Sequence, residues 1–519
     1  MRYPFHTLLK LAPHTINPSV RGAMGDKQKV AFSALKRKAD GDLDGLKTTT
    51  RARISIRMKY ANGAIRITRT PGRKHAKNCI ILQDIIHKDY LESACIYSFF
   101  IAEDEIYEYL PFSHSAGGIP IYIGRDPNLD VPTGQEASML AGVNFQEKVS
   151  RKQLDSIRPA LQQLHSRRYG QNIHTFYAWG AGSCHSKVLL LVYPTFLRIV
   201  ITSCNMMTID TELGDNHWYV HDVPKRHSPS TPTGFEADLL SHMEALGTPE
   251  DFLESIRGGY DYSTVKVHLI TSAPGTCSGA KAEKHGLLRL RQVIKQLDLK
   301  LAEKNREGKL QLEICTASVG NLNARWLNGF YDCALGKDTL QTHDGTSAVP
   351  KLKLFYPTFQ DVKNADQVAQ DAASNIGCHT RPWESVPREV KSIFHHYESK
   401  DCGKLFHQKL VIAYNPRDST QLPYYVYIGS ANFSQSAWGA LEHDKRGNPL
   451  TSDKKLIKLS NFECGVLIPG HLISELLEDG TESWQDGIIP HNQSAATYDL
   501  PKDRAWNDYR WTKDYREAE

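Results

Sequence analysis

The sequence predicts an α/β protein that contains two structurally duplicated domains. Short apolar segments typical of strands alternate with helical patterns along the chain, which favours layers of helices on sheets. A motif of polar residues next to apolar strands also occurs twice, and its two histidines, at positions 185 and 407, are 222 residues apart. A repeat at that distance suits two domains of similar construction.

Length and composition set wide limits. At roughly 100–200 residues per domain, the 519 residues suffice for two to four domains. The chain is 40% hydrophobic and 23% charged, near the globular average, which excludes wholesale disorder, a collagen repeat and a coiled-coil rod. The longest apolar stretch, residues 188–201, contains a proline and an arginine and is shorter than the roughly 20 residues of a membrane-spanning helix. We expect no membrane association.

Charge and cysteine content narrow the class further. The 63 basic and 58 acidic residues leave a net charge of +5, which indicates a nucleic-acid partner only where the positive charge is clustered. The ten cysteines contain no Cys-x-x-Cys pair, so free thiols in a reducing compartment are expected. No group of cysteines and histidines has zinc-ligand spacing, so no metal site is expected.

The first seventy residues are expected to form a disordered basic tail. No acidic residue precedes Asp26, a bias found in mitochondrial presequences and in ordinary flexible tails, of which we favour the second. The basic residues between positions 36 and 77 could steer nucleic acid or carry nuclear import, or they could simply form a solvated tail. Both interpretations stay open.

Globular patterning begins near Cys79, and a break at residues 257–259 divides it into domains 71–258 and 259–519. Residues 79–82 and 94–101 fit strand or helix equally well. The remaining patterns predict strands at 120–123, 265–270 and 352–356 and helices at 235–243, 287–301 and 387–396.

The repeated motif consists of His-x-Lys, two apolar strands and Ile-x-Ser-x-Asn. Its polar members are His185, Lys187 and Asn205 in the first half and His407, Lys409 and Asn432 in the second. One His-x-Lys carries little information, because histidines are common on surfaces and in cores. Two copies that share a distant Ile-x-Ser-x-Asn are hard to attribute to packing alone.

Strand geometry would bring the polar members of each copy together. Residues i and i+2 of a strand project from one face, and a hairpin that folds back places Ser-x-Asn beside His-x-Lys. If a pseudo-twofold axis relates the halves, both sets meet in one cavity. Lysines and amides around two imidazoles suit a phosphoryl group, since they stabilise its oxygens while the histidines act as nucleophile and as acid or base.

An acidic residue is expected beside one imidazole, because a carboxylate that accepts the second ring N–H fixes the orientation of the ring. The candidate is Glu463, in the strand-like segment 461–466 that follows the second motif. The alternative is an ordinary surface glutamate next to a strand, and the residues alone do not choose between the two.

The motif pair resembles the phospholipase D superfamily, whose two His-x-Lys motifs meet at a domain interface. The aspartate usual five positions after each lysine is replaced by Val192 and Tyr414, which resembles the tyrosyl-DNA phosphodiesterase branch acting on 3′ ends. Stretches similar to that branch, its fungal members included, are residues 65–71, 317–322, 430–441, 462–467 and 498–504. The resemblance implies two phospholipase D-like domains, each a mixed β-sheet flanked by helices, related by a pseudo-twofold axis with the active site at their interface.

The resemblance also implies a function, namely a DNA repair phosphodiesterase that hydrolyses 3′-phosphotyrosyl DNA, such as stalled type IB topoisomerase adducts, and other 3′-blocking groups. His185 would form a covalent phosphohistidine while His407 protonates the leaving phenolate and then activates water, so that a 3′-phosphate remains. Glu463 would orient His185, and the nonbridging oxygens would be held by Lys187, Lys409, Asn205 and Asn432. The lysines supply charge that many phosphoryl-transfer enzymes obtain from Mg²⁺, so no cofactor is expected.

Two serines match family positions that contact the DNA backbone, Ser318 and Ser434. The family often has a lysine directly after the second serine, and Gln435 at that place implies a weaker phosphate contact. Trp179, just before the first motif, would stack on a base or belong to the core. A glutamine expected about ten residues after Asn205 is replaced around Asp215 and Asn216, which puts the support of His185 in question.

The expected partner is DNA, single- or double-stranded, that carries a 3′-linked tyrosine or topoisomerase peptide. We expect a monomer in the nucleus, with a mitochondrial pool as an open alternative. Two other functions stay open: another phosphodiesterase or nuclease of the superfamily, and a catalytically silent DNA-binding scaffold. The missing aspartates argue against the first, and the intact His-Lys pairs argue against the second.

Overall fold

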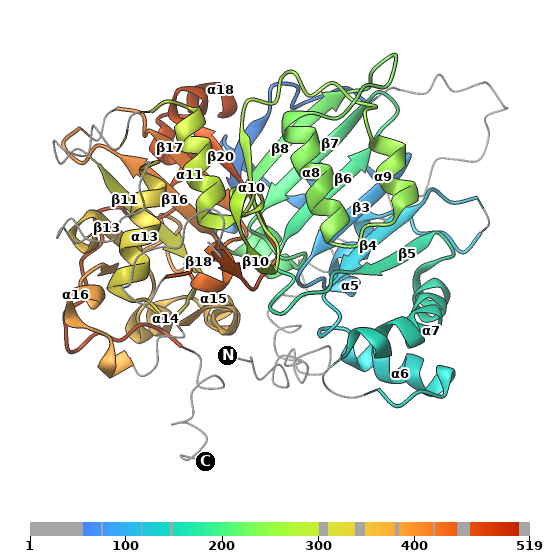
Figure 1. Ribbon diagram of the computed structural model, residues 1–519, viewed down its shortest axis with the longest axis horizontal. Helices are drawn as coiled ribbons and strands as arrows, with labels where there is room; N and C mark the ends of the chain where they lie inside the picture. The colour runs from blue at the N-terminus through green and yellow to red at the C-terminus, as the bar shows by residue number, and fades with distance from the viewer. Residues whose placement is uncertain are drawn as a thin grey trace, which may run out of the picture.

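In the computed structural model two large β-sheets lie side by side and carry helices on their faces (Figure 1). The structure describes residues 56–73, 76–115, 117–145, 149–299, 301, 310–337, 348–378, 383–418, 421–443 and 457–507. Most of the predicted tail, residues 1–55, thus lies outside the described residues, together with shorter segments.

The tail ends earlier than its composition predicts. Residues 64–68 form β1 (Ala64–Thr68), a fully buried strand of the first sheet, so the predicted tail boundary at residue 70 is wrong. The basic character of this segment misled the prediction, because Arg66 is buried. Its guanidinium donates hydrogen bonds to Asn78 Oδ1 at 3.0 Å and to the carbonyl of Leu476 at 2.9 Å.

The first sheet has eight strands in the order β2-β1-β8-β7-β6-β3-β4-β5. Its middle strands run antiparallel from β1 to β3, whereas β3, β4 and β5 are parallel. The strands besides β1 are β2 (Cys79–Ile80), β3 (Ser93–Ser98), β4 (Ile121–Arg125), β5 (Ile173–Tyr177), β6 (Lys187–Val192), β7 (Phe196–Thr202) and β8 (His217–Pro224).

The second sheet has seven strands in the order β15-β13-β11-β16-β17-β20-β9. From β9 to β11 its neighbouring strands are antiparallel, and the last two pairs, β11 with β13 and β13 with β15, are parallel. The first sheet has the same sequence of pairings when it is followed from β1 to β5. Its strands are β9 (His268–Ser272), β11 (Gln311–Thr316), β13 (Leu352–Phe355), β15 (Phe394–His395), β16 (Lys409–Tyr414), β17 (Tyr425–Gly429) and β20 (Glu463–Pro469). The predicted fold class, two similar domains with mixed sheets, is confirmed.

Two small sheets complete the strands. One joins β10 (Gly275–Cys277), β19 (Ile457–Leu459) and β18 (Ala440–Leu441), and the other joins β12 (Ser318–Val319) and β14 (Gly377–Cys378). The large sheets meet where β6, β7 and β8 contact β17 and β20. This contact region sets the two repeated motifs against each other.

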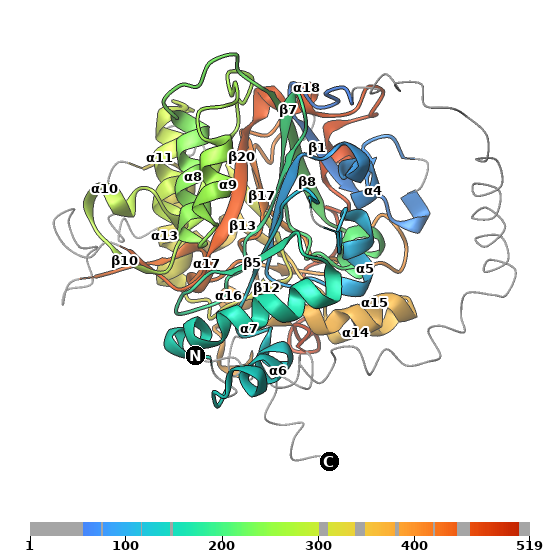
Figure 2. The same ribbon diagram turned by 90° about the vertical axis from the view of Figure 1, so that its right-hand side faces the viewer.

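Helices cover the sheets on two sides. Figure 2 shows four of them as one layer: α8 (Gly234–Ala245), α9 (Glu250–Ile256), α11 (Gly286–Gln296) and α13 (Ala324–Ala334). The opposite side carries α4 (Leu82–Ile85), α5 (Glu103–Ile106), α14 (Phe359–Asn364) and α15 (Gln367–Ala372). The helices α6 (Val131–Ala141) and α7 (Arg151–Tyr169) pack on each other around a small core of their own. Shorter helices are α10 (Gly279–Ala282), α16 (Arg388–Lys391), α17 (Gln435–Trp438), α18 (Ile473–Leu476) and α19 (Trp484–Ile488).

Most predicted elements are present. The ambiguous segments at 79–82 and 94–101 contain strands β2 and β3, and the helix expected at 287–301 is α11, which ends at Gln296. The helix predicted over 387–396 begins as expected after Pro387, but its second half is wrong, because α16 stops at Lys391 and the next apolar residues form edge strand β15, which pairs with β13. The predicted division after residue 258 falls between β8 and β9, and as a domain boundary it stays a prediction. Within the described residues, no helix has the length and apolar character needed to cross a membrane.

Candidate active site

The two His-x-Lys motifs occupy equivalent places at the start of β6 and β16. Lys187 and Lys409 are the first residues of these strands, and each histidine lies two positions earlier. Antiparallel pairing of β6 with β7 and of β16 with β17 returns the chain to the motif, so each Ser-x-Asn follows directly beside it. The hairpin geometry expected from the sequence is present in both halves.

Each histidine is attached to the opposite half through its backbone. The N–H of His185 donates to the carbonyl of Phe462 at 2.9 Å, and the N–H of His407 donates to the carbonyl of Asp215 at 3.1 Å. Isolated parallel bridges accompany both contacts, Cys184 with Phe462 and Asp215 with Phe406. As a result the two buried imidazoles face each other with ring centroids 6.3 Å apart.

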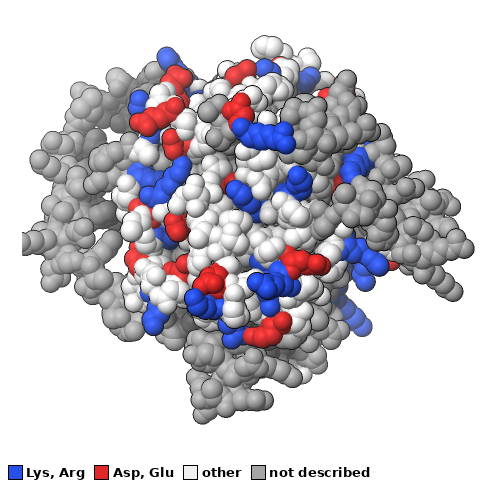
Figure 3. All heavy atoms as spheres, turned by 90° about the vertical axis from the view of Figure 1, so that its left-hand side faces the viewer, with Lys and Arg blue, Asp and Glu red and all other residues white. Residues whose placement is uncertain are grey.

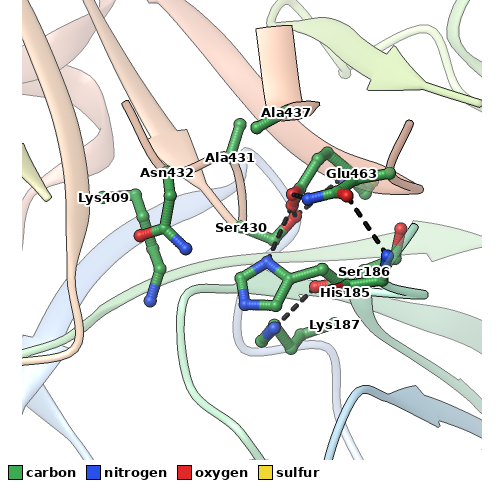
Figure 4. A network of polar contacts seen from close by, with 12 residues as sticks. His185, Ser186, Lys187, Lys409, Ser430, Ala431, Asn432, Ala437 and Glu463 are labelled. Atoms are coloured by element: carbon green, nitrogen blue, oxygen red, sulfur yellow. Dashed lines mark hydrogen bonds and ion pairs between the residues drawn. The ribbon is translucent and has the colours of Figure 1, made fainter. Parts of the chain in front are cut away.

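The His185 ring is held by a buried carboxylate of the second half. Its Nδ1 lies 2.9 Å from Glu463 Oε2, as Figure 4 shows. Two further donors reach the same carboxylate, the Ser430 hydroxyl to Oε2 at 2.5 Å and the Asn461 amide to Oε1 at 3.0 Å. Glu463 is 1% exposed, which excludes the surface-glutamate alternative, and this burial raises its pKa to about 7.

The His407 ring has a carboxylate partner that sequence reasoning missed. Its Nδ1 lies 2.9 Å from Oδ2 of Asp210, a buried residue of the first half in the π-helical turn η4 (Ile209–Leu213). The signal was weak, because Asp210 follows Asn205 by five positions whereas Ala437 stands at that distance from Asn432. Only Glu463 was therefore expected beside a histidine.

The sequence departure at positions 215 and 216 affects a different histidine from the one expected. The Asp215 carbonyl accepts the N–H of His407, as described above. The Asn216 amide donates to the carbonyl of Asp210, the residue whose carboxylate contacts His407, at 3.0 Å. The replaced positions thus lie beside His407, while the Nδ1 of His185 has Glu463 as its partner.

The two lysines are buried, and each contacts the backbone of the histidine two positions before it. Lys187 Nζ donates to the carbonyl of His185 at 2.6 Å, and Lys409 Nζ donates to the carbonyl of His407. Burial, followed by repulsion from Lys409, lowers the pKa of Lys187 well below its usual range, and burial lowers the pKa of Lys409 to about 7.

Burial likewise lowers the pKa of both imidazoles. The pKa of His185 falls well below its usual value because of burial and then the charges of the two lysines, and that of His407 falls to about 4, mainly through burial. Four basic groups thus share one low-dielectric pocket and disfavour each other's protonation. An anionic group between them would offset this repulsion, as expected of a phosphate site.

The two asparagines differ in how they are held. Asn432 Oδ1 accepts hydrogen bonds from the Ser318 N–H at 3.0 Å and from the Thr316 hydroxyl at 3.2 Å, and Figure 4 shows its amide nitrogen turned toward His185. Asn205 is buried, and among the described residues its side-chain oxygen has no hydrogen-bond partner. The Asn432 oxygen is thus occupied by protein donors, which turns its amide nitrogen toward His185, whereas the Asn205 oxygen is not occupied.

This geometry can be compared with known proteins. Residues 64–508 match the family model described as tyrosyl-DNA phosphodiesterase. The chain belongs to this family.

Curated relatives of the chain include tyrosyl-DNA phosphodiesterase 1 of Arabidopsis thaliana, 25% identical over 308 residues, which are 55% of this chain and 46% of the relative. The Drosophila melanogaster protein of that name is 22% identical over 312 residues, 54% of this chain and 49% of the relative. The alignments thus span about half the length of these relatives. The crystal structure of yeast tyrosyl-DNA phosphodiesterase superimposes with a TM-score of 0.59 at 14% identity, covering 86% of this chain and 99% of that chain, which shows a shared fold.

The two serines that resemble DNA contacts of the tyrosyl-DNA phosphodiesterase family lie next to Asn432. Ser318 begins β12, and Ser434 donates its N–H to the Asn432 carbonyl at 2.8 Å. The Ser434 hydroxyl also accepts a hydrogen bond from the N–H of Ala437 at 3.2 Å and so caps α17. Gln435, which departs from the family pattern, donates to the carbonyl of Asn321 at 3.0 Å.

Two aromatic residues complete the surroundings. Trp179 is 37% exposed, so it is not a core residue, while stacking on a base stays a prediction. Phe99 was not identified from the sequence, yet its ring centroid lies 5.2 Å from that of His185 and 5.4 Å from Lys187 Nζ. Among the described residues, no group of three or more His, Cys, Asp or Glu side chains is arranged to hold a metal ion.

Proposed function

We propose that this chain hydrolyses 3′-phosphotyrosyl DNA and other blocked 3′ ends and leaves a 3′-phosphate. The observation that carries the proposal is the pair of buried imidazoles 6.3 Å apart, each next to a carboxylate and flanked by a lysine. Membership of the tyrosyl-DNA phosphodiesterase family supports this substrate class.

In the first step His185 attacks the phosphorus. Glu463 accepts the Nδ1 hydrogen, so the lone pair of Nε2 is directed at the substrate. The P–N bond forms as the P–O bond to the tyrosine breaks, and His407 gives its Nε2 proton to the departing phenolate oxygen. The two lysines and the two asparagine amides stabilise the negative charge on the nonbridging oxygens.

In the second step water replaces the histidine. His407, now neutral, takes a proton from the attacking water, and the P–N bond breaks with its electron pair returning to His185 Nε2. The products are a 3′-phosphate and the starting enzyme with His407 protonated again. The same imidazole thus serves as acid and then as base.

Two features near the histidines are assigned to parts of the proposed substrate. A small hollow beside His407 and Asp210 has apolar walls from Ile209, Leu213, Val368, Ile376 and Phe406, and we propose that the tyrosine leaves on this side. Ser318 and Ser434, which lie next to Asn432, are the residues that we propose to contact the DNA backbone. The face of the second half in Figure 3 carries acidic and basic residues interspersed, so the proposed path of DNA does not depend on a basic face there.

The test uses an oligonucleotide with a 3′-phosphotyrosine, incubated with the full chain in the presence and absence of EDTA. We expect release of a 3′-phosphate oligonucleotide at equal rates in both tubes. Release of product in neither tube would reject the function, and loss of product on chelation alone would reject the proposed use of lysines in place of a metal ion.

The proposal extends to a monomer that acts in the nucleus, and the nuclear location is supported by the basic residues between positions 36 and 53. The location of a tagged full chain should be compared with that of a chain without residues 1–55, which keeps β1 intact. Loss of nuclear signal on truncation is expected. Mitochondrial signal that disappears on truncation would favour the presequence alternative.

A further inference from the structure

The buried carboxylate of Asp210 has no role in the steps above. It comes from the first half of the chain and lies against the acid–base histidine of the second half. We propose that Asp210 is a positioning residue for His407, which it holds so that Nε2 can deliver a proton to the leaving oxygen and then take one from water. This inference rests on the proposed function and adds a residue to it.

The turn that carries Asp210 is fastened at several points. The Asp210 carbonyl accepts hydrogen bonds from the Asn216 amide at 3.0 Å and from Cys204 Sγ at 3.3 Å. Its carboxylate oxygen Oδ2 accepts the N–H of Asn205 at 2.8 Å and lies 2.9 Å from His407 Nδ1. One oxygen therefore ties the acid–base histidine to the backbone of a phosphate-site asparagine.

A carboxylate does more at this place than fix the ring. An ionised carboxylate only accepts hydrogen bonds, so Nδ1 of His407 carries the hydrogen and Nε2 faces the pocket. The carbonyl of Ser203, 3.2 Å from the same Nδ1, would suffice to select that tautomer. The negative charge of Asp210 adds stabilisation of the imidazolium, which the proposed cycle needs before leaving-group protonation and again after water activation.

Asp210 remains ionised in its surroundings. Burial acts to raise its pKa, but the charges of His407 and Lys409 and the hydrogen bond from His407 outweigh burial, so the pKa lies below its ordinary value. The carboxylate is thus negative throughout the pH range in which the enzyme would work. It keeps its own charge while the proton moves at His407 Nε2.

The alternative is that Asp210 only supports the fold by binding the Asn205 backbone. The two roles differ in their response to the leaving group. Tyrosinate is a strong base that needs a proton as it departs, whereas 4-nitrophenolate is a much weaker base and leaves without one. A positioning residue for the acid matters for the first leaving group and little for the second, whereas a structural residue matters equally for both.

The experiment compares wild type and Asp210→Asn on two oligonucleotides, one ending in 3′-phosphotyrosine and one in a 3′-(4-nitrophenyl) phosphate, in single-turnover assays. The variant should form the covalent intermediate from the tyrosyl substrate about 100-fold more slowly. With the nitrophenyl substrate formation should change only a few-fold. The His185 adduct should then accumulate on denaturing gels, because water activation also needs His407.

Two further variants keep the inference open to refutation. Asp210→Glu retains the charge but displaces it by one methylene, so its loss should be smaller than that of Asp210→Asn and still larger for the tyrosyl substrate. Glu463→Gln, which affects the nucleophile, should slow both substrates alike. Equal losses on both substrates in the Asp210 variants, or no loss at all, would overturn the assignment. If the wild type cleaves neither oligonucleotide, the proposed function itself is wrong and the inference falls with it.

Discussion

The two halves of the candidate active site are built on equivalent strands, but the histidine of each half contacts a different kind of carboxylate. Glu463 begins the β20 strand and contacts His185, the proposed nucleophile, whereas Asp210 lies on a π-helical turn and contacts His407, the proposed acid–base residue. Burial raises the pKa of Glu463 to about 7, whereas the neighbouring cations keep the pKa of Asp210 below its ordinary value. A duplicated scaffold can therefore hold two identical motifs in unequal electrostatic surroundings, which suits them to unequal roles.

The largest difference between the halves should appear on removal of the histidines. His185→Ala removes the nucleophile, so turnover should fall on the order of a thousandfold or more with no adduct. His407→Ala or His407→Asn should slow both steps, and a covalent adduct should accumulate. Turnover with denaturing gels measures both effects, and wild-type activity in either variant would refute the assigned roles.

The next difference concerns the carboxylate of the nucleophile half. Because the pKa of Glu463 is raised to about 7, the carboxylate gains a proton as pH falls through that value and no longer accepts from His185 as strongly. The kcat/KM of the wild type should therefore decline below about pH 7, and Glu463→Gln should be slow throughout and lack that decline.

A control is needed because Lys409 also has a pKa of about 7 and gains charge as pH falls, which favours phosphate binding. Only the part of the pH profile that disappears in Glu463→Gln belongs to the carboxylate. The matched control is Glu475→Gln, at an exposed glutamate 3.8 Å from Lys266, and its profile should equal that of the wild type. An acid limb that survives in Glu463→Gln would contradict the assignment.

Substitution of the two asparagines should lower activity in both cases but lower stability in only one. Asn432→Ala leaves the Ser318 N–H without its acceptor, so the free energy of unfolding should fall by about 1–3 kcal/mol in urea titrations. Asn205→Ala removes an oxygen without a partner among the described residues, so stability should change by less than about 0.5 kcal/mol. Both variants should lose activity, and equal losses of stability would contradict this comparison.

The smallest expected effect concerns the serines of the two Ile-x-Ser-x-Asn motifs. The Ser430 hydroxyl donates to Glu463 Oε2 at 2.5 Å, whereas the Ser203 hydroxyl donates to Asn216 Oδ1 at 2.6 Å and reaches no catalytic carboxylate. Ser430→Ala should lower kcat/KM by about tenfold, equivalent to one hydrogen bond to a charged group, and Ser203→Ala by less. A larger effect in Ser203→Ala would show that the halves are not divided as described.

Sequence reasoning was most successful where the chain repeats itself. The histidines, lysines and asparagines were found because two copies of a rare spacing occur on predicted strands. Glu463 was only a candidate from its strand, and the family resemblance was needed to place it beside His185. Asp210 was not found, because it has no counterpart in the second half and is delivered by an irregular turn. Local composition also failed where tertiary contacts reverse it, as at the buried Arg66 of β1.

The reciprocal backbone contacts, from His185 to Phe462 and from His407 to Asp215, have a consequence for inactivation. If the halves separate, each histidine loses its carboxylate and its backbone acceptor at once, even while both sheets remain folded. Loss of activity on heating should therefore precede loss of secondary structure. The proposed activity would thus be a more sensitive measure of the association of the two halves than the circular dichroism signal, which measures their folding.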